Sequence, residues 1–292
     1  WFWLGRHRPG TQPPHREAPM QIPHLNLAIV LSGAALLAGC VSPPENIIPK
    51  DVPELRPGML AGYLPRNVLP DSLALLPPPP AAGSSAHAAD DEAFRATLPL
   101  RNTARWQLAA EDANLKFPKA ADTFACALGA PVGPDTTPHL TTLLRRTLVD
   151  AGLSTYGAKD HYKRTRPFVV NKAPTCTPAE EATLAKDGSY PSGHAALGWA
   201  WGLILAEMAP ERANALLARG HAYGQSRVVC GVHWQSDVTQ GRVMGAAAVA
   251  RLHADAVFRA QFDEAAKELA AVRARGLKPA GNCTAEAAAL KP

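Results

Sequence analysis

The chain has 292 residues, of which 47% are hydrophobic, and this is ample for one sizeable core. Lysine and arginine number 30 against 25 for aspartate and glutamate, which gives a formal net charge of +5. Because this excess is spread along the chain without a long basic block, it argues against nucleic-acid binding and favours a basic pocket for small anions.

The first 39 residues are expected to be upstream sequence followed by a signal peptide, with Met20 as the expected start. The apolar run from Leu25 to Leu37 is too short for a stable membrane anchor, and its length is typical of the apolar core of a signal peptide. The run ends in LAGC, which is similar to a bacterial lipoprotein cleavage box and makes Cys40 a candidate lipidation site. The alternative is an ordinary secretory signal with a chance cysteine. Either interpretation predicts an exported, periplasmic protein, and lipidation would tether it to the outer membrane.

Four cysteines remain after Cys40, and an even number in an exported protein predicts up to two disulfides. Sequence alone leaves three connectivities open among Cys126, Cys176, Cys230 and Cys283. Free buried thiols are the alternative.

Residues 40–95 are rich in proline and cannot propagate a regular helix or sheet, so they form either a tether or an extended strap on the domain. Apolar side chains at Leu73, Leu75 and Leu76 favour the strap. A helical domain is expected over residues 96–277, followed by a C-terminal tail over 278–292.

Helical periodicity dominates the rest of the chain, and no convincing alternation of apolar and polar residues predicts a strand. Thr137-Pro138 is a helix start signal, and the leucines that follow it share one face until Gly152 and Gly157 interrupt the pattern. The later helices are expected over residues 192–208, 212–219, 228–250 and 263–275. The fold is therefore predicted to be all-α, a compact helical bundle.

The first chemical motif is KDHYKRTRP, which contains Lys159 and Arg166. Pro167 biases Arg166 away from helical geometry, so both cations are expected at a loop or helix end. In isolation, such a segment is more often a solvated basic run.

The second motif is PSGH. Ser192 is a favoured N-cap, Gly193 allows an anion to approach the backbone, and His194 lies directly inside the helix. Taken alone, this could be an ordinary capped helix with a satisfied histidine.

The third motif is SRVVCGVHWQSD, with Arg227, His233 and Asp237. The histidine and aspartate are four residues apart, so they are expected on one helical face, where the carboxylate accepts Nδ1–H and leaves Nε2 unprotonated as a nucleophile. A surface pair that merely stabilises a helix is the alternative.

Together, KxxxxxxRP, PSGH and SRxxxxxHxxxD resemble the three-part signature of the type 2 phosphatidic acid phosphatase superfamily, which also includes the vanadium haloperoxidases. The flanking text SYPSGH and QSRVVCGVHWQSD looks most like the class A bacterial nonspecific acid phosphatases. The resemblance runs from about Asp71 to Leu277. It implies a compact all-α domain that hydrolyses small phosphomonoesters with broad specificity, without a metal or another cofactor.

The resemblance also implies roles for individual residues, and these roles suit the chemistry of an anionic ester. His233 attacks phosphorus to give a phosphohistidine, Asp237 orients it, and His194 is the general acid and base. Phosphate binding falls to Lys159, Arg166, Ser192, Gly193 and Arg227.

Other functions fit the sequence less well. A lipid phosphate phosphatase would need several spans of ~20 apolar residues, which are missing after the leader. Vanadate-dependent haloperoxidase activity uses the same anion pocket, but typical members are much longer. A non-enzymatic, anion-binding envelope lipoprotein would not need His194, His233 and Asp237. The sequence leaves a homo-oligomer and a lipid anchor at Cys40 open, and it predicts no nucleic-acid partner.

Overall fold

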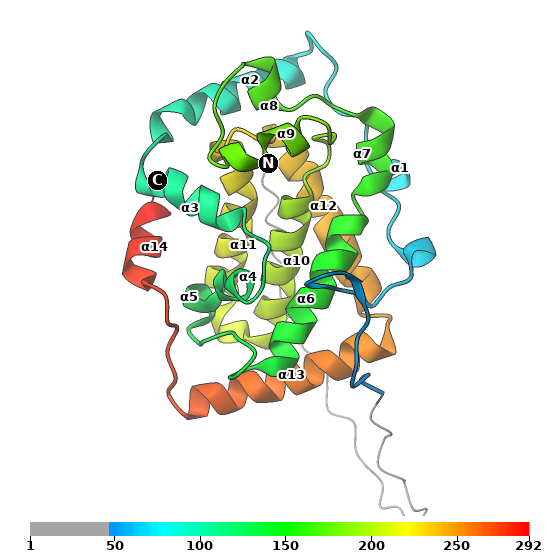
Figure 1. Ribbon diagram of the computed structural model, residues 1–292, viewed down its shortest axis with the longest axis vertical. Helices are drawn as coiled ribbons and strands as arrows, with labels where there is room; N and C mark the ends of the chain where they lie inside the picture. Colours follow the sequence, from blue (N-terminus) through cyan, green and yellow to red (C-terminus); the bar gives the residue numbers. More distant parts are fainter. Residues whose placement is uncertain (1–46, 292) are drawn as a thin grey trace, which may run out of the picture. The chain divides into compact units, whose positions relative to one another are not determined.

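Helices account for most of residues 47–291, the part of the chain that the computed structural model describes (Figure 1). The sheet within this range is a short antiparallel hairpin of β1 (Glu54–Arg56) and β2 (Met59–Leu60). The prediction of an all-α fold is therefore confirmed. The predicted signal peptide and Cys40 lie outside the described residues.

Fourteen α-helices lie within the described range. The helices are α1 (Ser72–Leu75), α2 (Ser85–Ala96), α3 (Ala104–Asp112), α4 (Lys119–Asp122), α5 (Ala125–Leu128), α6 (Pro138–Leu153), α7 (Tyr156–Tyr162), α8 (Pro167–Val170), α9 (Glu181–Leu184), α10 (Gly193–Met208), α11 (Ala213–Val229), α12 (Gln235–Leu252), α13 (Ala256–Ala274) and α14 (Cys283–Ala289). Short 3₁₀ turns cover Arg66–Val68, Leu98–Leu100, Pro178–Glu180 and Pro210–Arg212.

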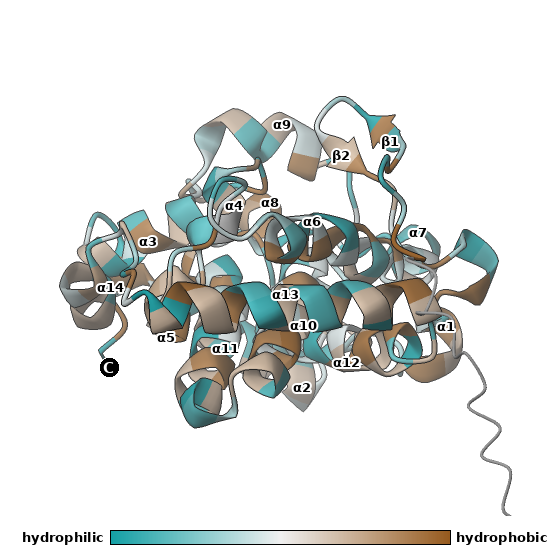
Figure 2. Cartoon of the chain, turned by 90° about the horizontal axis from the view of Figure 1, so that it is seen from below, coloured by the Kyte–Doolittle hydropathy of each residue, from teal (hydrophilic) through white to brown (hydrophobic). Residues whose placement is uncertain are grey.

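Helix α10 lies at the centre of the core, between α11 and α12, while α6 packs against α10 and α13 packs against α6 (Figure 1). Its sequence is apolar on nearly every face, as expected of a helix surrounded by others. Fully buried Trp201 donates its indole N–H to the Leu144 carbonyl of α6 at 3.2 Å, which fixes these two helices together. Outer helices such as α13 carry polar residues on their solvent side (Figure 2). Within residues 47–291, no helix combines the length and apolar character needed to cross a bilayer.

Helix α12 approaches α10 so closely that two of its positions have no room for a side chain. A Cβ atom at Gly241 would lie 2.4 Å from the Ser192 carbonyl oxygen, and one at Gly245 would lie 2.3 Å from that of Ala196. Both neighbours are backbone atoms that cannot move aside cheaply. This contact places the start of α10 directly beside the start of α12.

The proline-rich segment from Ile47 lies along the domain as a strap, as one of the two alternatives predicted. Backbone N–H groups of Tyr63 and Leu64 donate to the buried Asp150 carboxylate of α6 at 2.9 and 3.0 Å. Leu76 is buried as expected, but Leu73 and Leu75 are exposed, so the anchoring residues differ from those predicted. The strap ends earlier than residue 95, because Ser84 caps α2 by accepting from His87 N–H.

Two disulfides select one of the three connectivities. Cys126–Cys283 joins the turn at α5 to α14, and Cys176–Cys230 joins the loop after α8 to the end of α11. Cys230, one end of the second bridge, lies in the third motif between Arg227 and His233.

Three helix boundaries in the second half were predicted wrongly. The helix predicted over 212–219 continues to Val229 as α11. The helix predicted over 228–250 begins only at Gln235, as α12. Gly231 adopts φ +77° in the break, a conformation that other residues rarely adopt. Helix α13 begins at Ala256, seven residues before the expected start, because Asp255 caps it by accepting from Phe258 N–H.

The contact between α12 and α10 predicts that Gly241→Ala destabilises the protein. The added methyl group must push two backbones apart, which should cost about 2 kcal/mol and lower the melting temperature by roughly 4–8 °C. Gly152→Ala is the matched control, because a Cβ atom there meets nothing within 4 Å. Alanine is the better helix former, so the control should melt at the same or a slightly higher temperature. Equal melting temperatures for wild type and Gly241→Ala would contradict the close packing.

Candidate active site

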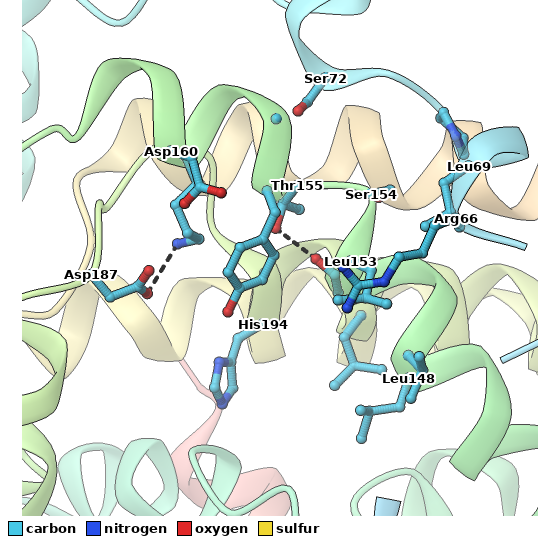
Figure 3. A pocket seen from close by; sticks show the side chains of 18 of the residues that line it. Arg66, Leu69, Ser72, Leu148, Leu153, Ser154, Thr155, Asp160, Asp187 and His194 are labelled. Carbon is cyan, nitrogen blue, oxygen red and sulfur yellow. Dashed lines mark hydrogen bonds and ion pairs between the residues drawn. The ribbon is translucent and has the colours of Figure 1, made fainter. Parts of the chain in front are cut away.

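A cleft of about 940 Å³ brings together residues from all three motifs. It lies beside α6 and α7 and reaches inward to the start of α10 and the end of α11 (Figure 3). The predicted site residues that line it are Lys159, Arg166, Gly193, His194, Arg227 and His233.

The two cations of the first motif enter the cleft from successive short helices. Lys159 lies in the last turn of α7, and Arg166 is the extended residue before Pro167 and α8, as the proline predicted. Both side chains are buried, and backbone carbonyls hold them: Gly188 O accepts from Lys159 Nζ at 2.6 Å, and Leu184 O from Arg166 Nε at 2.8 Å. Burial and the neighbouring Arg166 lower the pKa of Lys159 to about 8.

The second motif forms the start of α10, as predicted. Ser192 is the N-cap, and its Oγ accepts from Ala195 N–H at 3.2 Å. Its side chain is fully buried and does not line the cleft, whereas Gly193 and His194 do. The structure therefore shows Ser192 as the cap of the helix, and phosphate binding by its hydroxyl stays a prediction.

His194 is held through one ring nitrogen. Its Nε2 lies 3.1 Å from the Ala113 carbonyl oxygen. Because a carbonyl oxygen only accepts, Nε2 carries a proton, and Nδ1 is the nitrogen that can exchange a proton with another group. Burial and then the charge of Arg227 lower the pKa of His194 well below 6.5. Burial and the nearby cations thus disfavour the imidazolium form of His194 in the free enzyme.

The nucleophile candidate lies in the loop before α12, so the expectation of a shared helical face was wrong. Trp234 is the N-cap of α12 and Asp237 is in its first turn, where Oδ2 accepts from Trp234 N–H at 2.9 Å. The same oxygen lies 3.3 Å from Nδ1 of His233. Asp237 therefore contacts His233 by capping the start of α12, although the two residues do not share a helical face.

The other nitrogen of His233 faces a cation. Its Nε2 lies 3.0 Å from Nη1 of Arg166, and a guanidinium can only donate, so Nε2 is the acceptor. This matches the predicted tautomer, with the proton on Nδ1. Burial, Arg166 and Lys159 lower the pKa of His233 well below 6.5, so the ring is neutral and keeps a lone pair on Nε2.

A buried network behind Asp237 was not predicted from the sequence. Arg164 donates to Asp237 Oδ1 and to Asp90 Oδ2, both at 2.7 Å, and Asp90 also accepts from the Ser236 hydroxyl at 2.6 Å. Burial raises the pKa of Asp237, and the adjacent Arg164 opposes that rise. The sequence carries a weak sign of this network, because KRTRP contains a second arginine two residues before Arg166.

Arg227, in the last turn of α11, is buried with unused hydrogen-bond donors. Only 1% of the residue is exposed, and its Nε and Nη1 atoms have no hydrogen-bond partner within residues 47–291. Burial and the neighbouring Arg166 lower its pKa to about 10. A buried guanidinium with free donors at the edge of a cleft is suited to bind an anion bidentately.

The structure also places a carboxylate among these cations, and sequence reasoning missed it. Asp187 Oδ2 lies 2.9 Å from Arg166 Nη2 and 3.4 Å from Lys159 Nζ. Figure 3 shows the Asp187 side chain pointing into the cleft. Its position in KDGSYP reads as an ordinary polar turn, so the sequence offers no signal for this contact.

Both apolar and polar residues line the cleft away from the three motifs. The strap contributes Leu55, Met59 and Leu69, and α6 contributes Leu148 and Leu153. Figure 2 shows β1, β2 and α9 on the same side of the domain. The strap also contributes Arg56, Arg66, Asn67, Asp71 and Ser72, so apolar and polar side chains alternate on this part of the lining.

Comparisons with known proteins agree with this geometry. Residues 139–260 match the PAP2 superfamily, and this range includes every predicted catalytic and phosphate-binding residue. A non-specific acid phosphatase of Providencia stuartii is 43% identical over 212 residues, which cover 72% of this chain and 86% of the relative.

Two further relatives are also acid phosphatases of similar identity to this chain. A non-specific acid phosphatase of Salmonella typhimurium is 44% identical over 66% of this chain and 78% of its own length. An acid phosphatase of Zymomonas mobilis is 42% identical over 66% of this chain and 73% of its own length. With three motifs assembled in one cleft and relatives this similar over most of their length, the chain belongs to the class A bacterial non-specific acid phosphatases of the PAP2 superfamily.

Proposed function

We propose that this enzyme hydrolyses phosphate monoesters of broad structure through a phosphohistidine on His233, without a metal ion. The observation that carries the proposal is the pair of unpartnered, buried guanidinium nitrogens on Arg227, beside Arg166 and Lys159. Three cations around one neutral imidazole are an arrangement that stabilises an anion next to a nucleophile. They can supply the charge that a metal supplies in other phosphatases.

In the first step, Nε2 of His233 attacks phosphorus and the bond from phosphorus to the ester oxygen breaks. The Arg166 Nη1–H now bonded to Nε2 turns to a phosphate oxygen, which frees the lone pair. As the imidazole becomes cationic, its Nδ1–H interacts more strongly with the Asp237 carboxylate. Developing charge on the phosphoryl oxygens is stabilised by Lys159, Arg166 and Arg227.

His194 would supply the proton that the leaving oxygen needs. Its Nδ1 is the exchanging nitrogen, because Nε2 is committed to Ala113. The free enzyme disfavours the imidazolium, so the bound phosphate, which carries up to two negative charges, must raise the pKa of His194. Substrate binding would thereby charge the acid only when it is needed.

In the second step, water attacks the phosphohistidine and His194 takes up a water proton. The bond between phosphorus and Nε2 breaks, inorganic phosphate leaves, and both histidines return to their starting states. The cleft has a volume of about 940 Å³ and a lining of both apolar and polar residues, and this room for leaving groups of different structure supports broad specificity. The leader sequence supports export to the periplasm, with Cys40 as the candidate lipid anchor.

The central test is trapping of the phosphoenzyme. Wild type quenched during turnover of a ³²P-labelled monoester, with EDTA present, should retain acid-labile label, whereas His233→Ala should retain none and lose about 10³-fold or more in kcat. His221→Ala, an exposed histidine of α11 outside the cleft, is the control and should keep both label and activity. Labelling of His233→Ala, or loss of activity with EDTA, would contradict the mechanism.

The pKa directions predict an acidic optimum. Below the pKa of His233 the nucleophile is protonated, and above the pKa of His194 the acid is lost. Both values lie below 6.5 in the free enzyme, so kcat/KM should peak below pH 6.5. Arg227→Met removes a cation that lowers both values, so both limbs of the profile should move to higher pH. Arg242→Met, on α12 and outside the cleft, should leave the profile in place. An unmoved profile in Arg227→Met would rule out this electrostatic origin.

The network behind Asp237 predicts a role for Arg164 in positioning. Arg164→Met leaves a buried carboxylate without its ion pair, so His233 loses its orientation and kcat should fall by roughly 10²-fold. Vanadate affinity should change little, because the three cleft cations remain. Arg95→Met, an exposed arginine of α2, is the control. A parallel loss of vanadate binding and kcat would indicate a general structural role instead.

A further inference from the structure

The phosphate-binding cations already have a counter-ion in this structure. The Asp187 carboxylate pairs with both Arg166 and Lys159, whose side chains are almost completely buried, while 33% of its own side chain is exposed. It lies in the loop after α9 and is separated from the first motif by some twenty residues of sequence. The contact is therefore a feature of the folded cleft.

Every N–H of Arg166 is in use. Nε donates to the carbonyls of Leu184 and Asp187, Nη1 faces Val232 O and His233 Nε2, and Nη2 donates to Asp187 Oδ2 and Gly188 O. Four of these acceptors are backbone carbonyls that belong to fixed turns. The two side-chain acceptors are the nucleophile and the Asp187 carboxylate. Nη1 becomes available to a phosphate oxygen when its bond to His233 Nε2 breaks, but a bidentate contact also needs Nη2, which is available only when the Asp187 carboxylate leaves.

The Asp187 side chain is free to leave, whereas the cations are not. Its backbone is fixed, because Asp187 N–H donates to Leu184 O at 3.1 Å and its carbonyl accepts from Arg166. Rotation about χ1 can carry the exposed carboxylate into solvent without moving the loop. Lys159 and Arg166 are buried and held by carbonyls, so they stay behind as an uncompensated positive pair.

We propose that Asp187 is the resting counter-ion of the phosphate site, and that an incoming phosphate group must displace it. The inference rests on the proposed role of Lys159 and Arg166 in binding phosphate. Asp187 holds the cations together in the empty enzyme and competes with every anion that enters. It thereby weakens the binding of inorganic phosphate and limits inhibition by this product. It also disfavours singly charged anions, because such an anion brings no more negative charge than the carboxylate that it displaces.

The test compares Asp187→Asn with the wild type in two measurements. The inhibition constant of inorganic phosphate should fall roughly fivefold or more, since removal of a competing ion pair of modest strength changes affinity by about that factor. The rise in melting temperature caused by a fixed phosphate concentration should also be larger in the variant, because tighter binding stabilises the folded state further. The second measurement needs no turnover.

Asp160→Asn is the matched control. Asp160 lines the same cleft and lies one residue from Lys159, but it makes no ion pair with Lys159 or Arg166 (Figure 3). It should change the inhibition constant by less than about twofold, the effect of one screened charge. Asp187→Ser provides a second variant with the same expectation as Asp187→Asn.

An unchanged or weaker phosphate affinity in both Asp187 variants, with wild-type activity intact, overturns the counter-ion role. An equal gain in Asp160→Asn also overturns it, because the effect would then come from net charge alone. The underlying assignment is tested separately with Lys159→Met. If that variant binds phosphate as well as wild type, the phosphate site itself is misplaced, whatever the Asp187 variants show.

Discussion

The two oxygens of the buried Asp237 carboxylate connect three segments that are far apart in the sequence. Oδ2 accepts from the start of α12 and faces His233, and Oδ1 binds Arg164 of the first motif. The backbone carbonyl of the same residue accepts from Ser192 N–H at 3.0 Å, which ties in the start of α10. One residue therefore caps a helix, orients the ring of His233 and fixes the positions of the other two motifs. A buried carboxylate is costly unless it is paired this fully.

In contrast to this well-paired carboxylate, the cleft holds several buried cations close together. Burial, followed by the charge of Arg166, lowers the pKa values of Lys159 and Arg227, and burial together with nearby cations lowers those of His194 and His233. An anion relieves this repulsion, and the site gains stability from the same charge on which it acts. The same cations that repel one another in the empty site are therefore suited to stabilise a highly charged transition state.

The sequence predicted those parts of the site that depend on local rules. Pro167 placed Arg166 outside a helix, and Ser192 was recognised as an N-cap, because these effects act within a few residues. The helix over 228–250 was wrong because apolar residues continue through a break that Gly231 and the Cys176–Cys230 bridge produce. Arg164 and Asp187 were missed because their roles come from partners about 20 to 75 residues away, and neither charge looks unusual in its own segment.

The strap lines the cleft although it lies outside the three motifs. It supplies one wall of the outer cleft, yet it precedes the three motifs in the chain and contributes none of the reacting groups. Its hold on α6 is made largely by main-chain groups of residues 61–64, which donate to Asp150 or accept from Arg146, so side chains elsewhere in the strap can change without loosening it. One wall of the cleft and the residues of the three motifs are therefore encoded in separate stretches of the chain, so changes in that wall need not alter the motifs.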